Sequence, residues 1–387
     1  MSVTQPRGFV AAGVACEIKP TGAPDLALVA TDDGRPVAAA GVFTSNLATA
    51  APVQVSRAHL VATDGRAAAV VLNSGNANAA TGEAGRADAE RTCWLMANEL
   101  GCRADDVLVC STGLIGIPLP MPALSRGIAP LAAARAADGG LAAARAIMTT
   151  DTVEKQVVVE RPGFTVGGMA KGAAMLAPNM ATMLAVLTTD AQAEPAALRA
   201  GLQAAVGVSF NALSVDGCTS TNDTVLVLAS GRRGPADIGA LTDALTEACT
   251  GLAEQMAADA EGATKVVVVR VSGAISDAEA IVAARKVAES QLVKCSLYGE
   301  DPYWGRVVSE LGSAGVDFDP ETVSVAYNGV TACRAGVAAG FDASAMKAAM
   351  AERRITLACD LGLGPGTGVV LTNDLTHAYI DENMRTS

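Results

Sequence analysis

The sequence lacks the histidine and cysteine clusters on which many catalytic and metal sites depend. Among 387 residues there are only two histidines, His59 and His377, so few histidines are available to act as a catalytic base. The nine cysteines are scattered singly and form no Cys-x-x-Cys pair, a pattern that argues against a zinc site and against a disulfide framework. We therefore expect reduced, mostly buried cysteines.

Basic runs and membrane-length apolar runs are also missing. The 28 Lys and Arg residues stand against 40 Asp and Glu residues, which leaves a net charge of −12. Such an acidic chain is a poor partner for nucleic acid or for an anionic membrane surface. No apolar stretch reaches the length of a bilayer span, and the N-terminus lacks a basic segment followed by a long apolar run. We expect a cytoplasmic protein.

Aromatic residues are scarce, but apolar residues are not. Aromatics make up 3% of the chain and hydrophobic residues 50%, so the core must be built mainly from Ala, Val and Leu. The apolar patterns alternate between strand and helix spacing, which predicts an α/β fold too long for one ordinary core. Predicted helices cover 81–100, 121–136, 140–148, 194–206, 236–259 and 277–290. Predicted strands cover 25–32, 36–44, 67–72, 107–110, 155–160, 164–166, 183–189, 223–229, 265–271, 291–297, 355–360 and 368–371.

Within the stretch 167–190 the sequence pattern changes from that of a loop to that of a buried strand at a single peptide bond. Before Ala181–Thr182 it is a loop rich in Gly, Ala, Met and Pro, and after it the run MLAVLTT has the pattern of a buried strand. A Thr at the start of a strand is usually only a strand residue. Here the small Ala181 before it, the Gly- and Ala-rich loop and the absence of a serine elbow or a Cys/His pair favour Thr182 as a nucleophile.

The chemistry expected of Thr182 begins with cleavage of its own chain. Its hydroxyl attacks the carbonyl of Ala181, an ester forms, and water cleaves that ester. The new α-amino group, with a pKa of roughly 8, then serves as the base for the hydroxyl of the same residue, so no histidine is required.

Three other positions have both a structural and a functional interpretation. Ser111-Thr112-Gly113 follows a predicted strand and is either a strand-to-loop turn or an oxyanion site. Lys171 lies in a mostly apolar stretch, where it is either a solvated loop residue or the partner of an anion. Glu261 follows a long predicted helix, an unfavourable place for an acid because of the helix dipole, so it is either a surface acid or the partner of an ammonium group.

The residues above belong to a series of motifs that resembles the glutamate N-acetyltransferase / ornithine acetyltransferase (ArgJ) family. The resemblance covers essentially the whole chain. The matching segments are GVFTSN at 41–46, VLNSGNANAATG at 71–82, CSTGLIG at 110–116, TTDT at 149–152, GGMAKGAAMLAPNMATML at 167–184, STNDT at 220–224, DAEGATK at 259–265, GEDPYWGR at 299–306 and TNDLTHAYIDEN at 372–383. Tyr303 departs from the family, which usually has Asn at that place.

The resemblance implies a mixed-sheet, two-lobed acyltransferase of the α/β class that cuts itself into an α chain, 1–181, and a β chain, 182–387. It implies acetyl transfer from N²-acetylornithine to L-glutamate in arginine biosynthesis, and it admits acetyl-CoA as a second acetyl donor. No metal or bound cofactor is implied. The two chains are expected to stay together and to pair into a heterotetramer.

The resemblance also implies a role for particular residues. Thr182 would carry the acetyl group, and Thr112 with Gly113 would form the oxyanion site. The substrate-contacting residues would be Thr149, Lys171, Thr182, Glu261, Asn383 and, at the C-terminus, Ser387 or its neighbour Thr386.

Two other functions fit the same sequence. One is an amidase or aminopeptidase that uses the same Thr182 with water as the acceptor. The other is a non-catalytic amino-acid-binding relative that keeps the fold. Ornithine release without glutamate would favour the first, and an uncut chain of 38.8 kDa would favour the second.

Overall fold

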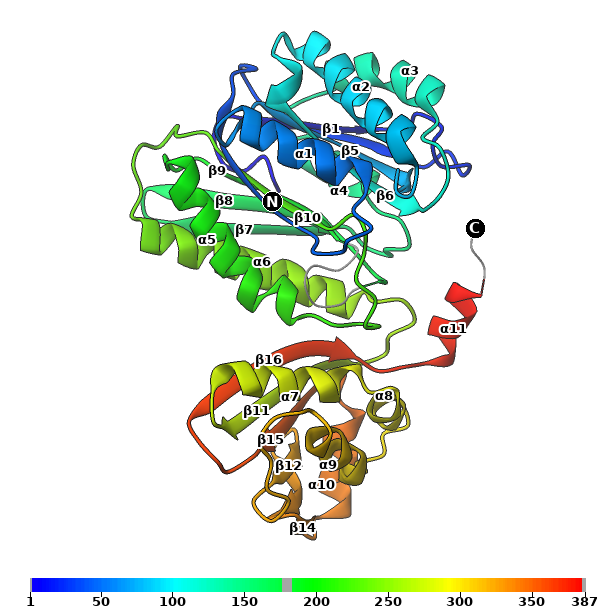
Figure 1. Cartoon of the computed structure of the whole chain (residues 1–387), viewed down its shortest axis with the longest axis vertical. Coiled ribbons are helices and arrows are strands. Elements are labelled where there is room, and N and C mark those ends of the chain that lie inside the picture. Colours follow the sequence, from blue (N-terminus) through cyan, green and yellow to red (C-terminus); the bar gives the residue numbers. More distant parts are fainter. Residues whose placement is uncertain (1, 176–182, 385–387) are drawn as a thin grey trace. The chain divides into compact units, whose positions relative to one another are not determined.

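The computed structural model describes residues 2–175 and 183–384, which divide into two compact units (Figure 1). The first unit takes Met1–Asn211 and Cys218–Met256, and the second takes Ala212–Gly217 and Ala257–Ser387. Both units combine helices with a mixed sheet, so the predicted α/β class is confirmed. No helix in the described part of the chain is long and apolar enough to cross a membrane.

The first unit contains two sheets. The four-stranded sheet has the order β1 (Phe9–Val14), β2 (Leu26–Thr31), β5 (Ala69–Asn76) and β6 (Val107–Leu114). The six-stranded sheet has the order β4 (Arg66–Ala67), β3 (Val37–Phe43), β10 (Thr224–Ala229), β9 (Leu184–Thr189), β8 (Phe164–Lys171) and β7 (Lys155–Arg161). In each sheet one pair is parallel, β5 with β6 and β9 with β10, and the other pairs are antiparallel.

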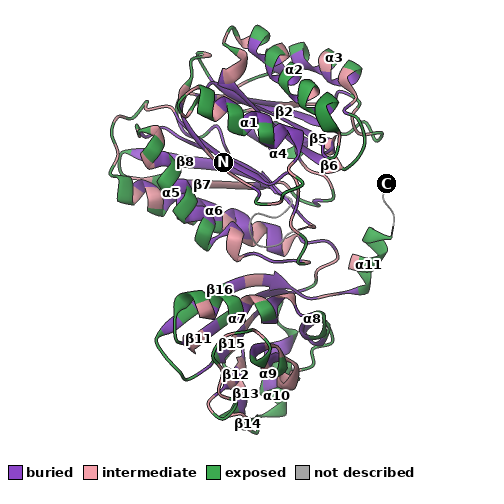
Figure 2. Cartoon of the chain, viewed as in Figure 1, coloured by how far each residue is buried: buried purple, intermediate pink, exposed green. Residues whose placement is uncertain are grey.

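Helices cover the outer faces of these sheets and one helix lies between them. The outer helices of the first sheet are α1 (Ala51–Ala62), α2 (Gly82–Leu100) and α3 (Met121–Ala133), and those of the second are α5 (Pro195–Val208) and α6 (Ile238–Ala258). The short α4 (Gly140–Ala146) contacts strands of both sheets. One apolar cluster joins Val29, Leu72, Val186 and Leu226 from the facing sheets. Because both faces of β2, β5, β9 and β10 are covered, these strands appear in the sequence as continuous apolar runs. Figure 2 shows that the inner strands of the two sheets are buried.

The second unit has one six-stranded sheet and its own apolar core. The strand order is β14 (Val337–Ala338), β13 (Val330–Arg334), β12 (Ser324–Tyr327), β15 (Arg354–Asp360), β11 (Val266–Ala274) and β16 (Gly366–Asn373). The helices are α7 (Asp277–Glu289), α8 (Gln291–Tyr298), α9 (Trp304–Gly312), α10 (Ala343–Ala351) and the C-terminal α11 (His377–Asn383).

One predicted segment has a different type of secondary structure. Residues 291–297 were expected as a strand, but they form α8, because the Ser290 hydroxyl accepts a hydrogen bond from the Val293 amide and caps a helix there. The strand predicted over 265–271 is β11, in which Arg270 is exposed and Val268 is half-buried. The strands at 25–32 and 36–44 are correct, yet β2 and β3 enter different sheets.

Candidate functional site

The predicted oxyanion residues lie inside a strand rather than in a turn. Thr112 and Gly113 belong to β6, which pairs in parallel with β5 and shifts register at Gly75 and Asn76. Gly113 has a φ of +133°, and a Cβ built there would lie 2.3 Å from the backbone carbon of Gly75. Only glycine fits such a close approach. The side chain of the neighbouring Thr112 is buried, with 1% of the residue exposed.

Asn222 ties the end of β6 to the other sheet of the first unit. Its Nδ2 donates to the carbonyl oxygens of Ala77 at 2.6 Å and Ser111 at 2.9 Å. Asn222 lies just before β10, so these two bonds cross from one sheet to the other. Asn222 is therefore a buried link that holds the Thr112 strand in place.

Lys171 and Thr112 are brought together although they lie on different sheets. Lys171 ends β8, its side chain is 3% exposed, and its Nζ donates to Thr112 Oγ1 at 3.4 Å. The interpretation of Lys171 as a solvated loop residue is therefore wrong. A buried ammonium beside a buried hydroxyl is an arrangement that can bind an anion or an oxyanion.

Asp151 organises the surroundings of Lys171. Its Oδ1 accepts from Lys155 Nζ and from the Gly172 amide, both at 2.7 Å. Its Oδ2 accepts from the Thr149 amide at 3.0 Å and lies 3.9 Å from Lys171 Nζ. Burial opposes the charged form, but the two lysines and these hydrogen bonds outweigh it and hold the pKa of Asp151 below its usual range.

Asp151 and Lys155 are functional candidates that the sequence reasoning missed. The signal was present, because Asp151 belongs to the TTDT segment quoted above. The predicted substrate residue Thr149 joins the same group through its amide and through its hydroxyl, which lies 3.5 Å from Asp151 Oδ2.

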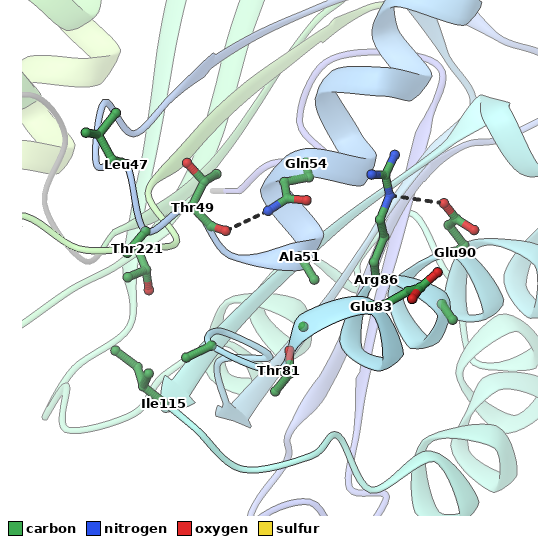
Figure 3. Close-up of a pocket in the computed structure, with 14 residues that line it drawn as sticks. Leu47, Thr49, Ala51, Gln54, Thr81, Glu83, Arg86, Glu90, Ile115 and Thr221 are labelled. Carbon is green, nitrogen blue, oxygen red and sulfur yellow. Dashed lines mark hydrogen bonds and ion pairs between the residues drawn. The ribbon is translucent and has the colours of Figure 1, made fainter.

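A hollow of about 840 Å³ opens in the first unit (Figure 3). Its walls come from the chain around Leu47, from α1 and from the start of α2, and Arg86 and Glu90 pair at 3.5 Å on one side. Ile115 and Thr221 also line a narrower recess that contains Thr112, Gly113 and Asn222. The larger hollow therefore shares two wall residues with the recess at Thr112, and it has room for a small-molecule ligand.

Glu261 and Asn383 meet in the second unit. Asn383 Nδ2 donates to Glu261 Oε2 at 2.7 Å and to the carbonyl oxygen of Tyr379 at 2.9 Å. Glu261 lies in a turn after α6 and is 7% exposed, so its interpretation as a surface acid is wrong. Thr376 caps α11 and donates to the Gly262 carbonyl oxygen at 2.7 Å, which holds the C-terminal helix to the Glu261 turn.

The remaining predicted residues lie outside the described part of the chain. They are the two sides of the predicted cut, Ala181 and Thr182, and the C-terminal Thr386 and Ser387. The described chain resumes at Met183, whose amide donates to Asp223 Oδ1 at 2.9 Å. Among the described residues, no group of three or more His, Cys, Asp or Glu side chains is placed to hold a metal ion.

Comparison with known proteins identifies the family. The sequence model of the ArgJ family matches residues 10–386. The chain is 50% identical over 384 residues to the arginine biosynthesis bifunctional protein ArgJ of Thermobifida fusca, covering 99% of each chain. It is 49% identical to the protein of the same name from Mycobacterium tuberculosis, covering 98% of this chain and 95% of that one.

Among solved structures, ornithine acetyltransferase from Mycobacterium tuberculosis complexed with ornithine is 48% identical. The match covers 47% of this chain and 96% of that chain, with a TM-score of 0.44. The family match over nearly the whole sequence, together with the full-length relatives, shows that the chain belongs to the ArgJ family.

Proposed function

We propose that this chain transfers the acetyl group of N²-acetylornithine to L-glutamate through an acetyl ester on Thr182. Membership of the ArgJ family supports acetyl transfer in arginine biosynthesis. The observation that carries the proposal is the meeting of Lys171 Nζ with Thr112 Oγ1 beside the Gly113 backbone. This group offers donors for the negative charge that develops when an acyl carbonyl is attacked.

The nucleophile is created by the cut before Thr182. The strand that precedes the cut, β8, and the strand that follows it, β9, are antiparallel neighbours with Lys171 opposite Leu184. A cut between them leaves both pieces in one sheet, so the α chain (1–181) and the β chain (182–387) stay together without a peptide bond. Two of these α–β pairs then associate into a heterotetramer.

Protons move in a closed cycle. The Thr182 hydroxyl attacks the acetyl carbonyl of N²-acetylornithine and its proton passes to the α-amino group of Thr182. The bond from the acetyl carbon to the ornithine nitrogen breaks, and that nitrogen takes the proton. Glutamate then attacks the acetyl ester through its amine and reverses the sequence. Thr112 and Gly113 hold the oxyanion in both halves.

Each charged group of the two substrates has a proposed partner among the side chains of this protein. Both carry an α-carboxylate, for which Lys171 and Thr149 are the partners, and ornithine adds a side-chain ammonium, for which Glu261 is the partner. Asn383 orients Glu261 through its 2.7 Å hydrogen bond, and Ser387 completes the substrate contacts from the C-terminus.

The test begins with the N-terminus of the C-terminal fragment of the purified protein, which must be Thr182. Purified protein is then incubated with N²-acetylornithine with and without glutamate, and ornithine and N-acetylglutamate are measured. We expect both products only when glutamate is present. Equal ornithine release without glutamate would identify a hydrolase instead. A third incubation, with acetyl-CoA and glutamate, tests the second acetyl donor.

Thr182→Ala is expected to stay uncut and inactive, and activity near that of the wild type would refute the nucleophile. The matched control is Thr188→Ala, on the same region of chain, whose buried hydroxyl donates to the Val3 carbonyl oxygen. It should be cut and active, with only the loss of about 1 kcal/mol typical of one hydrogen bond.

A further inference from the structure

Asp374 is a buried carboxylate that holds the end of the turn in which Glu261 lies. It follows β16 directly and is 2% exposed. Its Oδ1 accepts from the amides of Thr264 and Lys265, both at 2.9 Å, and its Oδ2 accepts from the Thr264 hydroxyl. Burying a carboxylate is costly unless it is hydrogen-bonded, and a charged acceptor makes the stronger hydrogen bonds. Both oxygens of Asp374 therefore hold the same short piece of chain firmly.

Strand register places Asp374 beside this turn. The turn is closed by the Ala263 amide, which donates to the Ala260 carbonyl oxygen at 3.0 Å. The chain then enters β11, whose first residue stands opposite the last residue of β16. Because Asp374 is the next residue after β16, its side chain meets the chain where the Glu261 turn ends.

The strand end that carries Asp374 is itself anchored to α8. Lys294 of α8 is 4% exposed, and its Nζ donates to Thr372 Oγ1 at 2.6 Å and to the carbonyl and side-chain oxygens of Asn373, both at 2.9 Å. The Leu375 amide donates to the Lys294 carbonyl oxygen at 3.3 Å. Asp374 therefore extends from a fixed piece of chain, and it can fix the turn in its own place.

The chain that follows Asp374 returns to the same turn. Thr376 donates to the Gly262 carbonyl oxygen, and Asn383 donates to the Glu261 carboxylate, both at 2.7 Å. Gly262 has a φ of +64°, and a Cβ built there would lie 2.3 Å from a backbone nitrogen of α11. The segment after β16 thus contacts the backbone on the C-terminal side of Glu261 and the carboxylate itself.

We propose that Asp374 is the positioning residue for Glu261, and that it thereby sets the preference for an acyl donor with a side-chain ammonium. This inference rests on the proposed function and deepens it. Asp374 acts through the backbone of the turn, whereas Glu261 is the group that binds the ammonium.

The two substrates respond differently to the position of Glu261. A hydrogen bond weakens steeply when its geometry is lost, and a displacement of about 1 Å can cost up to about 100-fold in rate. N²-acetylornithine carries the ammonium that Glu261 binds, and glutamate does not. A displaced Glu261 therefore impairs the half-reaction that uses N²-acetylornithine, while a general loss of folded protein impairs both half-reactions equally.

The test is Asp374→Ala in the full chain. In a two-step exchange, kcat/KM for N²-acetylornithine reports the first half-reaction and kcat/KM for glutamate reports the second. Misfolded protein lowers both values by the same factor, so their ratio, donor over acceptor, is independent of it. We expect this ratio to fall by about tenfold or more. If Asp374→Ala does not fold, Asp374→Glu replaces it, because its longer side chain keeps the charge and moves the turn.

Two further variants show whether Asp374 acts through Glu261. Asp374→Asn keeps an oxygen for the two amides, so its ratio should return to within about threefold of wild type. Adding Asp374→Ala to Glu261→Gln should leave the ratio where Glu261→Gln alone puts it, because two changes that act on one contact are not additive.

The matched control is Asp342→Ala in the same unit. Asp342 Oδ1 also accepts from two successive amides, those of Ser344 at 2.7 Å and Ala345 at 3.2 Å. It does so at the start of α10, which packs on β12 and β13, away from β11 and β16 in the strand order. This variant should be less stable to heat and should keep the wild-type ratio.

Two results would overturn the role of Asp374 and leave the proposed function standing. One is a folded Asp374→Ala chain whose ratio is within about threefold of wild type while Glu261→Gln lowers it. The other is a further fall when Asp374→Ala is added to Glu261→Gln. If Glu261→Gln itself leaves the ratio unchanged, the proposed ammonium contact of Glu261 fails, and the inference about Asp374 fails with it.

Discussion

The Nζ of Lys171 lies 3.4 Å from the Oγ1 of Thr112, although 59 positions separate the two residues in the chain. The contact joins the last residue of β8 to β6, and so joins the two sheets of the first unit. Both residues are buried. Water therefore neither screens the ammonium charge nor competes for the hydroxyl.

The first prediction concerns the Thr112 hydroxyl. Thr112→Val removes the hydroxyl and nearly keeps the volume, and it should lower kcat by about 10²–10³-fold, as expected for loss of one oxyanion donor. KM should change little. The control is Thr92→Val, which removes a buried hydroxyl on α2 that donates to the Asp88 carbonyl oxygen. Steady-state kinetics decide the matter, and a kcat within about threefold of wild type would exclude Thr112 from the oxyanion site.

The second prediction concerns the charge of Lys171. Lys171→Met keeps the length of the side chain and removes the ammonium, and it should raise KM for N²-acetylornithine and for glutamate by about tenfold or more. Lys171→Arg keeps the charge and should recover part of the affinity. The two KM values are measured in parallel. If both stay at the wild-type value in the Met variant, Lys171 does not bind the shared carboxylate.

The third prediction concerns Asp151 and pH. The pKa of Asp151 is held below its usual range, so the folded state binds fewer protons than the unfolded state below about pH 4. The stabilisation is complete above that pH and is lost as pH falls through the folded pKa. Asp151→Asn leaves two buried lysines without their counter-charge and should cost about 3–5 kcal/mol at pH 7, with the difference narrowing in acid.

Urea unfolding of the uncut Thr182→Ala chain, with and without the Asp151 change, measures this difference at several pH values. The exposed Asp138→Asn serves as the control and should have no measurable effect. A loss that is equal at pH 7 and pH 3 would show that the ion pairs do not stabilise the fold.

The fourth prediction separates two glycines with positive φ. In Gly113→Ala the new methyl group meets the backbone of Gly75 at 2.3 Å, while in Gly116→Ala, at a φ of +82°, nothing lies within 4 Å. We expect Gly116→Ala to cost about 1 kcal/mol from its backbone conformation alone. Gly113→Ala should cost at least about 3 kcal/mol because β5 and β6 must separate. Thermal unfolding of both variants tests the ranking, and an equal loss would contradict the close packing.

The fifth prediction uses the difference between the two substrates. Glu261→Gln keeps an acceptor for Asn383 and removes the negative charge. It should raise KM for N²-acetylornithine several-fold and leave KM for glutamate nearly unchanged, because glutamate has no side-chain ammonium. Asp381→Asn, on the exposed surface of α11, is the control. An equal rise in both KM values would show that Glu261 does not recognise the ammonium group.

Sequence reasoning succeeded where the signal is local and long. The helix predicted over 236–259 is α6, and the apolar runs around 107–110, 183–189 and 223–229 are β6, β9 and β10, because helical periodicity and buried runs leave a direct trace in the sequence. It failed at 291–297, where a short apolar segment is compatible with either state and the Ser290 cap decides for a helix.

The pairing of distant residues was beyond the reach of sequence patterns. Asp151 was not singled out because an isolated Asp after two threonines looks like a turn residue, and its contacts with Lys155, Gly172 and Lys171 arise only when β7 and β8 pair. The contact of Asp223 with the Met183 amide likewise depends on the parallel alignment of β9 and β10.

The sequence by itself determined the α/β class, the family and the change in composition at Ala181–Thr182, and it supplied the candidate reacting groups, because all of these depend on residue type and local order. The tertiary structure decided which of those groups meet. Strand register and sheet packing act over the whole chain. They bring Lys171 to Thr112, Asn222 to the Ser111 carbonyl oxygen of the other sheet, and Asp223 to the Met183 amide.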